Sequence, residues 1–163
     1  MKKAELTAIK QAILMEIEGY EFYRMAQKNF DNPEVKDAFG TLMDEERMHA
    51  DWLKTTYEHL NHSPDKSLDL SFLDTKPSAK IFDWKNLMHQ SAQSPLAALG
   101  IALELEKSSM AHYKNLAQQA DDANLERLFN VLATWEESHY KQFDELYQQL
   151  KDEWWSTQHY APF

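Results

Sequence analysis

Apolar side chains recur at helical spacing in four long stretches of this chain, and the stretches form two pairs. Within the first pair the only break is at Pro33, a residue favoured in the first turn of a helix. Within the second pair the break is the polar dipeptide Asp121-Asp122. Two helices joined by a short turn form an antiparallel hairpin. The pattern therefore predicts two helical hairpins, at residues 3–62 and 96–153.

The segment between the hairpins, residues 61–95, has a different composition. It contains three of the five prolines together with many Ser and Asp residues. This composition predicts a long connection, with one short helix expected around Phe82–Ser91. The last residues, 154–163, form an aromatic tail that we expect to cover an end of the bundle or a dimer contact. We predict one all-α domain over residues 1–163, an antiparallel four-helix bundle with one long crossover between its second and third helices.

The composition excludes several classes of function. The chain has 163 residues, 43% of them hydrophobic, which is enough for a packed core. It has no cysteine, which excludes disulfides, thiolate zinc sites, iron–sulfur clusters and a cysteine nucleophile. The net charge of −10 argues against nucleic acid as a partner. Acidic residues interrupt the first apolar stretch, so we expect neither a signal peptide nor a membrane anchor, and we expect the protein in the cytoplasm.

Each of the four apolar stripes contains one carboxylate where the helical period calls for an apolar side chain. These residues are Glu16, Glu46, Glu106 and Glu136. Two of them are followed three residues later by a histidine on the same helix face, namely His49 and His139. Burying an isolated carboxylate is expensive, so we expect these side chains to share a partner.

The spacing of these carboxylates points to an internal duplication. Thirty residues separate Glu16 from Glu46 and also Glu106 from Glu136, and the second pair follows the first at an offset of 90 residues. The same offset relates further positions: Tyr23/Tyr113, Phe39/Phe129, Leu42/Leu132, His49/His139, Tyr57/Tyr147 and Leu60/Leu150. We interpret this as two copies of one helical hairpin.

The duplication predicts where the polar residues meet. Each Glu lies about 15 residues, or roughly 22 Å, from its hairpin turn, which places it near the middle of its helix. If the second hairpin is inverted relative to the first, both pairs lie at the same height. A connection that spans the length of the bundle would deliver this inversion, which explains the long crossover.

Six converging side chains of this kind predict a site for two metal ions. Four carboxylates balance the charge of two divalent cations, and each imidazole supplies one nitrogen. Carboxylate-rich sites with imidazole suit iron(II) or manganese(II). We interpret the neighbouring acidic residues as solvent-facing or as i,i+4 partners, and we expect His112 at the surface and no ligand role for the other histidines. The off-stripe acidic residues are Glu18, Glu21, Glu45, Glu104 and Glu137.

Four segments resemble the rubrerythrin branch of the ferritin-like superfamily over about residues 4–150. They are E-x-x-G-x-x-x-Y from Glu16, DEERMHA from Asp44, ELEKSSMAHY from Glu104 and EESH from Glu136. The resemblance implies a ferritin-like bundle with a non-haem di-iron centre. It implies Glu46 and Glu136 as bridging carboxylates, Glu16 and Glu106 as terminal ligands, and His49 and His139 as one ligand per iron. It also implies that the hydroxyls of Tyr23 and Tyr113 orient carboxylates, although both could be plain core tyrosines.

The chain departs from typical rubrerythrins at two points. It has no cysteine for a rubredoxin-like domain, so an electron donor must be external. Ser109 stands where the family carries an additional glutamate. The resemblance implies an oxidoreductase that reduces peroxide or dioxygen, and a homodimer. The alternatives are a ferroxidase or iron-handling protein, a manganese catalase-like enzyme, and a metal-stabilised bundle without turnover.

Overall fold

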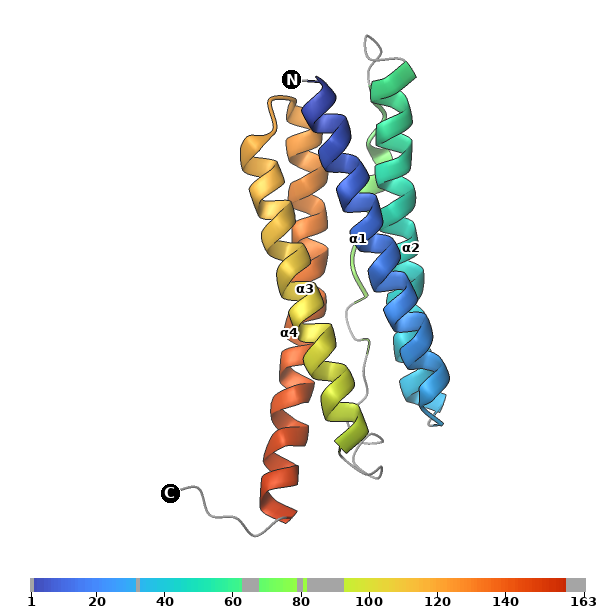
Figure 1. Ribbon diagram of the computed structural model, residues 1–163, viewed down its shortest axis with the longest axis vertical. Coiled ribbons are helices and arrows are strands. Elements are labelled where there is room, and N and C mark those ends of the chain that lie inside the picture. Colours follow the sequence, from blue (N-terminus) through green and yellow to red (C-terminus); the bar gives the residue numbers. More distant parts are fainter. Residues whose placement is uncertain (1, 32, 63–67, 79–80, 82–92, 158–163) are drawn as a thin grey trace.

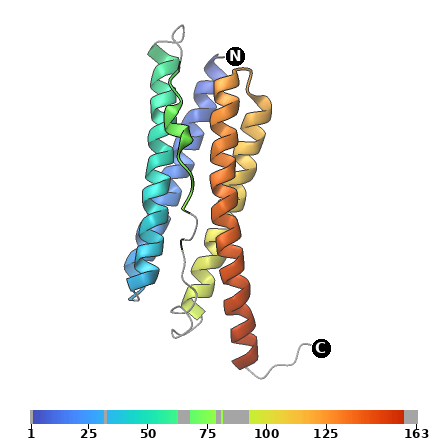
Figure 2. The ribbon, with the colours of Figure 1, turned by 180° about the vertical axis from the view of Figure 1, so that it is seen from behind.

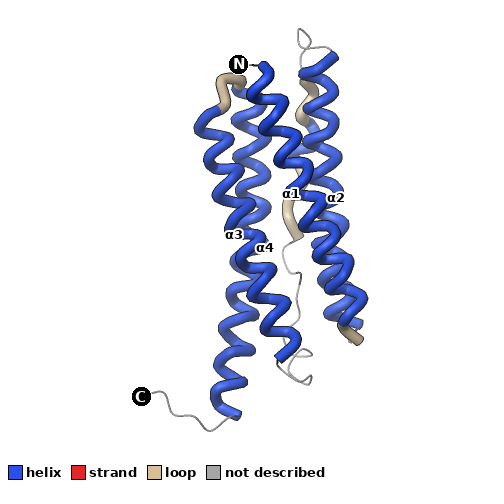
Figure 3. Tube along the Cα trace, viewed as in Figure 1, coloured by secondary structure: helices blue, strands red, loops and turns tan. Residues whose placement is uncertain are grey.

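The computed structural model describes residues 2–31, 33–62, 68–78, 81 and 93–157. Over these residues it contains helices and connections, and no strand (Figure 3). The elements are α1 (Lys2–Asn29), α2 (Pro33–His62), the 3-10 helix η1 (Ser71–Asp74), α3 (Gln93–Gln119) and α4 (Ala123–Thr157). The prediction of an all-α four-helix bundle is confirmed.

The two hairpins lie side by side and are inverted relative to each other (Figure 1). The turn between α1 and α2 lies at one end of the bundle, and the turn between α3 and α4 lies at the other. Between α2 and α3 the chain must therefore travel the length of the bundle. Its described part runs between α2 and α4 on one side of the bundle (Figure 2). The inversion inferred from the carboxylate spacing is the observed arrangement.

Local sequence explains where the helices begin. Pro33 is the first residue of α2, as predicted. Asp122 caps α4, because its Oδ1 accepts hydrogen bonds from the backbone N–H groups of Asn124 at 2.7 Å and Leu125 at 3.1 Å. α3 begins at Gln93, three residues earlier than predicted, so Pro95 lies in its first turn. Proline is tolerated there because backbone N–H groups in the first turn have no partner inside the helix.

The C-terminal part of α4 is longer than predicted. The helix continues to Thr157, so Trp154 and Trp155 belong to it and not to an irregular tail. Their rings pack edge to face with centroids 4.9 Å apart. No proline or glycine interrupts this stretch, so nothing in the local sequence ends the helix at residue 153. The short helix expected around residues 82–91 and the remaining tail, residues 158–163, lie outside the described residues.

The hydrophobic core is divided into two clusters by a polar layer at mid-height. One cluster, toward the α3–α4 turn, includes Ile9, Leu53 and Leu128. The other, toward the α1–α2 turn, includes Phe39 and Phe143. The two clusters therefore leave the middle of the bundle for the buried polar side chains.

Among the described residues, no helix combines the length and apolarity needed to cross a membrane.

Candidate metal centre

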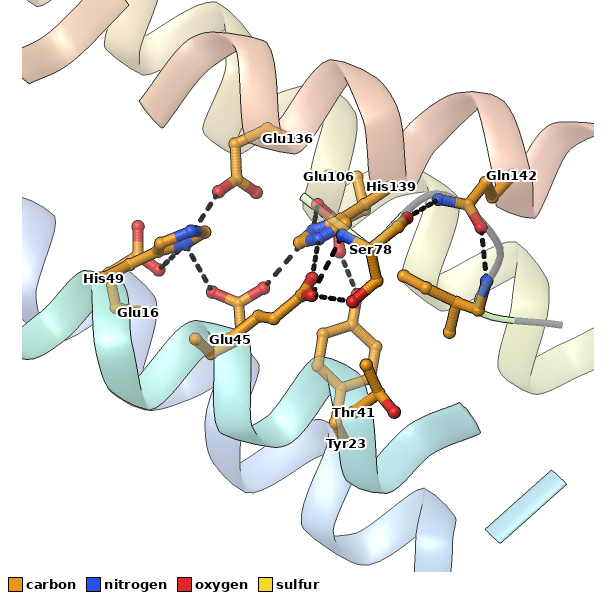
Figure 4. Close-up of polar contacts among 12 residues, drawn as sticks. Glu16, Tyr23, Thr41, Glu45, His49, Ser78, Glu106, Glu136, His139 and Gln142 are labelled. Carbon is orange, nitrogen blue, oxygen red and sulfur yellow. Dashed lines mark hydrogen bonds and ion pairs between the residues drawn. The ribbon is translucent and has the colours of Figure 1, made fainter. Parts of the chain in front are cut away.

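The structure brings the six polar residues of the apolar stripes together in that middle layer. Figure 4 labels all of them except Glu46. Each helix supplies at least one of them, because the inverted hairpins place all four helix midpoints at one height. All six residues are between 0% and 4% exposed. They are Glu16 from α1, Glu46 and His49 from α2, Glu106 from α3, and Glu136 and His139 from α4.

The six residues form two overlapping groups of four. The first consists of Glu16, Glu46, His49 and Glu136, and the second of Glu46, Glu106, Glu136 and His139. In each group, one ligand atom from every residue lies within 4.8 Å of the others. Glu46 and Glu136 belong to both groups, and each group adds one further carboxylate and one imidazole. This arrangement fits two adjacent ions that share two carboxylates.

Both histidines direct Nδ1 toward the carboxylates. His49 Nδ1 lies 3.3 Å from Glu16 Oε2, 3.4 Å from Glu136 Oε1 and 3.8 Å from Glu46 Oε2. His139 Nδ1 lies 3.5 Å from Glu106 Oε2 and 3.8 Å from Glu46 Oε1. The same ring nitrogen therefore faces the interior in both halves of the duplicated unit.

The imidazoles carry protons in the metal-free protein. Burial alone would lower the pKa of His49, but hydrogen bonds and charge interactions with Glu16 and Glu46 outweigh it and raise the pKa to about 10. Burial likewise opposes protonation of His139, and the charge of Glu106 with hydrogen bonds to Glu106 and Glu45 raises its pKa to about 9. Both histidines are therefore cations at pH 7.

The four carboxylates divide into two kinds. Burial raises the pKa of Glu46 well above its usual range, and the charges of Glu136 and Glu16 add to this effect. Burial and the charges of Glu106 and Glu16 do the same for Glu136. For Glu16 and Glu106, burial is outweighed by hydrogen bonds and histidine charges, which lower the pKa. Among these four carboxylates, the metal-free protein therefore favours the ionised form of Glu16 and Glu106 and the neutral form of Glu46 and Glu136.

Two tyrosines connect the hairpins to each other. The Tyr23 hydroxyl donates to Glu106 Oε1, and the Tyr113 hydroxyl donates to Glu16 Oε1. Each hydrogen bond crosses between α1 and α3, and each leaves the other carboxylate oxygen, Oε2, to face a histidine. Burial raises the pKa of both tyrosines, with further contributions from the glutamates, so both hydroxyls keep their protons and remain donors. This is the geometry by which a hydroxyl fixes a carboxylate.

Gly19 provides the space that Glu46 needs. A Cβ atom at this position would lie 3.3 Å from Glu46 Cδ and 3.4 Å from Glu46 Oε2. Glycine in a helix interior is destabilising relative to alanine, so the close approach of the carboxylate gives this glycine a physical role. The G of the E-x-x-G-x-x-x-Y pattern thus lies against one of the two shared glutamates.

Several buried atoms of this layer have unused hydrogen-bonding capacity. Among the described residues, Glu106 Oε2, Glu136 Oε1 and His139 Nδ1 make no hydrogen bond of ordinary geometry and have only histidine–carboxylate contacts at 3.4 Å or more. Buried polar atoms without partners are costly, and each such atom in a native structure calls for an explanation. Carboxylate oxygens and imidazole nitrogens are the donor atoms that iron(II) and manganese(II) accept. The residues present therefore fit a pair of such ions.

Two residues lie differently from the prediction, and one of them, Glu45, belongs to this layer. Glu45 was expected to face solvent, yet it is 8% exposed, and its Oε2 accepts a hydrogen bond from His139 Nε2 at 2.7 Å. Only a partial signal was present in the sequence: Glu45 precedes His49 by four residues and so lies on the same side of α2, but its contact with His139 of α4 depends on the fold. His112, expected at the surface, is half-buried beside Tyr113.

Three of the other off-stripe acidic residues lie as predicted, and Glu21 does so only in part, because it is half-buried and its ion pair spans three residues and not four. Glu18 and Glu104 are exposed. Glu137 pairs with Lys141, four residues later, at 2.7 Å. Glu21 pairs with Arg24. These contacts leave the buried layer to the stripe residues and Glu45.

A small pocket approaches the layer from outside between α1 and α2. It has a volume of about 220 Å³ and is lined by Glu16, Ile17, Tyr20, Glu21, Arg47, Ala50 and Lys54. Glu16 is a member of the buried layer, so the pocket ends against one of the candidate ligands. At the position equivalent to Ala50 in the second hairpin, the chain carries the bulkier Tyr140.

Fold and site together define a ferritin-like bundle with a carboxylate-rich centre, and comparisons with known proteins agree. The sequence model of the rubrerythrin family matches residues 8–147, so the chain belongs to the rubrerythrin family. No curated protein matches the chain. A solved structure of a hypothetical protein from Pyrococcus furiosus is similar in fold, with a TM-score of 0.68 and 21% identity over 91% of each chain.

Proposed function

We propose that this protein is a non-haem di-iron oxidoreductase that reduces hydrogen peroxide or dioxygen with electrons from a separate donor. The observation that carries the proposal is the pair of overlapping donor groups, which share Glu46 and Glu136 in a buried layer. When bound there, two iron(II) ions supply one electron each, which with two protons converts one hydrogen peroxide to two waters. Manganese has similar ligand preferences and is the alternative metal.

The six side chains would bind the ions in two ways. Glu46 and Glu136 would bridge, since each belongs to both donor groups. Glu16 with His49, and Glu106 with His139, would each complete one side. Because tyrosine hydroxyls hold the Oε1 atoms of Glu16 and Glu106, the Oε2 atoms are left for the ions. With six side chains serving two ions, coordination positions would remain for a small oxidant.

The electrons must come from outside the chain, because it has no cysteine to ligate an iron–sulfur or rubredoxin-type centre. A small redox protein or a small-molecule reductant would meet this need. The cytoplasm, where both iron(II) and such reductants are present, is the location we expect. The family resemblance adds a homodimer to the proposal.

The test is peroxide consumption by protein loaded anaerobically with iron(II), in the presence and absence of a chemical reductant. Peroxide turnover that requires the reductant is the expected result. Oxygen release without a reductant would instead indicate a catalase-like enzyme. Iron oxidised and retained well beyond two ions per chain would indicate ferroxidase or iron-handling activity. Bound metal with no turnover in any of these assays would indicate a structural role.

Two variants make this assay specific. Glu46→Ala removes a shared carboxylate and is expected to abolish turnover. Glu137→Gln changes a partly exposed glutamate of α4 that pairs with lysines, and this variant is expected to have the activity of the unmodified protein. Equal activity in both variants would contradict the assignment of the centre.

A further inference from the structure

The duplicated hairpins should build two equal metal positions, but the walls behind the two histidines differ. Behind His139 lie Glu45 and Gln142. The offset of 90 residues makes Trp135 the equivalent of Glu45, and Trp52 the equivalent of Gln142. Both equivalent positions have therefore exchanged a polar side chain for an aromatic one. One half of the centre has a polar outer wall and the other an aromatic outer wall.

The polar wall is a continuous set of hydrogen bonds. His139 Nε2 lies 2.7 Å from Glu45 Oε2. The other oxygen of Glu45 accepts hydrogen bonds from the Ser78 backbone N–H at 3.2 Å and from the Ser78 hydroxyl. Gln142 holds the same crossover segment, because its Nε2 donates to the Ser78 carbonyl at 3.2 Å and its Oε1 accepts from the Ile81 N–H at 2.7 Å. The crossover thus fixes Glu45, and Glu45 fixes His139 (Figure 4).

The aromatic wall offers His49 no comparable partner. The His49 ring packs edge-on against Trp135, with centroids 4.9 Å apart, and lies 5.3 Å from Trp52. The crossover continues this wall, since Phe72 lies 5.7 Å from Trp52. His49 Nε2 is buried and has no hydrogen-bond partner among the described residues. Packing holds this ring, whereas a carboxylate holds the other.

A carboxylate behind a ligating histidine changes the metal that the histidine binds. It fixes the proton on Nε2, leaves the Nδ1 lone pair for the ion, and makes the imidazole a stronger donor. Loss of such a partner costs about 10-fold to 100-fold in metal affinity. We propose that the two metal positions are chemically different, and that Glu45 is a positioning residue that makes the His139 position the tighter one. This inference rests on the proposed two-metal centre.

The experiment is a titration of the metal-free full chain with cobalt(II), followed by calorimetry and by the visible spectrum of the bound ion. The expected result is two steps whose dissociation constants differ by about 10-fold to 100-fold. Glu45→Gln is expected to weaken the tighter step by a factor in that range and to leave the weaker step unchanged. Ser78→Ala, which loosens Glu45 from the other side, is expected to shift the same step by less.

Two variants that each keep only one metal position show which histidine belongs to which binding step. In His49→Ala, which retains the His139 position, adding Glu45→Gln is expected to weaken the remaining step. In His139→Ala, the same addition is expected to change nothing. If Glu45 acted only through overall folding, Glu45→Gln would weaken the remaining binding step in both variants, and this result would overturn the inference.

Other outcomes overturn it as well. Two binding steps with equal dissociation constants in the unmodified protein would show that the two walls do not change metal affinity. The two-metal centre would still hold in that case. No binding of any ion would refute the centre itself and this inference with it. If Glu45→Gln fails to fold, Ser78→Ala in the two backgrounds gives the same comparison.

Discussion

Loading of the buried centre with metal should release protons, because the metal-free protein stores protons on the same side chains. His49 and His139, with pKa values raised to about 10 and about 9, are protonated at pH 7. An ion that binds Nδ1 must displace these protons. Glu46 and Glu136, whose pKa values are raised well above the usual range, add to the release as far as they are protonated.

The size of the effect follows from this proton inventory. Filling both positions at pH 7 should release about two protons from the histidines and up to about two more from the carboxylates. With two protons released, the overall loading constant rises about 100-fold for each unit of pH. The release should fall as the pH approaches 9 to 10, where the histidines lose their protons even without metal.

Calorimetric titration with cobalt(II) in buffers of different ionisation enthalpy measures the number of protons directly. Glu137→Gln, at a partly exposed glutamate outside the buried layer, is the matched control and should leave the number of released protons unchanged. A release of less than about one proton at pH 7, with two ions bound, would refute the reasoning. It would mean that the histidines are neutral in the folded protein or are not ligands.

The same pKa shifts determine how the stability of the metal-free protein depends on pH. A histidine whose pKa is higher in the folded state than its unfolded value near 6.5 stabilises the fold fully below pH 6.5. This contribution is lost as the pH rises through about 9 to 10. Urea unfolding without metal should therefore show a lower midpoint at pH 10 than at pH 7, and bound metal should reduce the difference. An unchanged midpoint would argue against charged histidines in the fold.

Three further changes test separate parts of the centre. Gly100→Ala, whose added Cβ would make an ordinary van der Waals contact with the Tyr147 ring at 3.9 Å, should raise the stability in urea unfolding by about 0.5–1 kcal/mol. Gly19→Ala places a methyl group against the Glu46 carboxylate, so it should lack this gain in stability and should weaken metal binding. Equal effects of both variants would contradict the close approach. Tyr23→Phe removes a hydrogen bond to a buried carboxylate and should cost about 1.5–3 kcal/mol of metal-free stability, measured the same way; a cost near zero would contradict that bond. Ala50→Leu should fill the pocket beside the centre and slow cobalt(II) entry in stopped-flow absorbance while leaving the final stoichiometry unchanged; an unaltered rate would place the entry route elsewhere.

The sequence was sufficient to predict the bundle and the meeting point of the polar residues. Helical periodicity revealed the stripes, and the repeated spacing of Glu16, Glu46, Glu106 and Glu136 supplied the register. An inverted pair of hairpins is the simplest arrangement that lets all four meet, and it also requires a long crossover. The helical periodicity thus predicted the bundle, and the repeated spacing of the glutamates predicted that they meet.

The outer wall of the centre was beyond that reasoning. The interpretation of Glu45 as solvent-facing did not foresee that the crossover runs between α2 and α4 and brings Ser78 onto Glu45. Composition identified the crossover as a connection but gave no path for it, so neither η1 nor the contact of Ser78 with Glu45 could be predicted. The exchange of Glu45 for Trp135 in the duplicated unit was visible in the sequence, but its meaning depended on that path.

The central claim is that six buried side chains hold two ions side by side, and iron content tests it most directly. Metal-free protein would be loaded anaerobically with iron(II), passed through a desalting column and analysed for iron per chain. The account predicts about two iron ions per chain in the unmodified protein and in Glu137→Gln, and a loss of both in Glu46→Ala. Fewer than about half an ion per chain, or two ions that persist in Glu46→Ala, would contradict it.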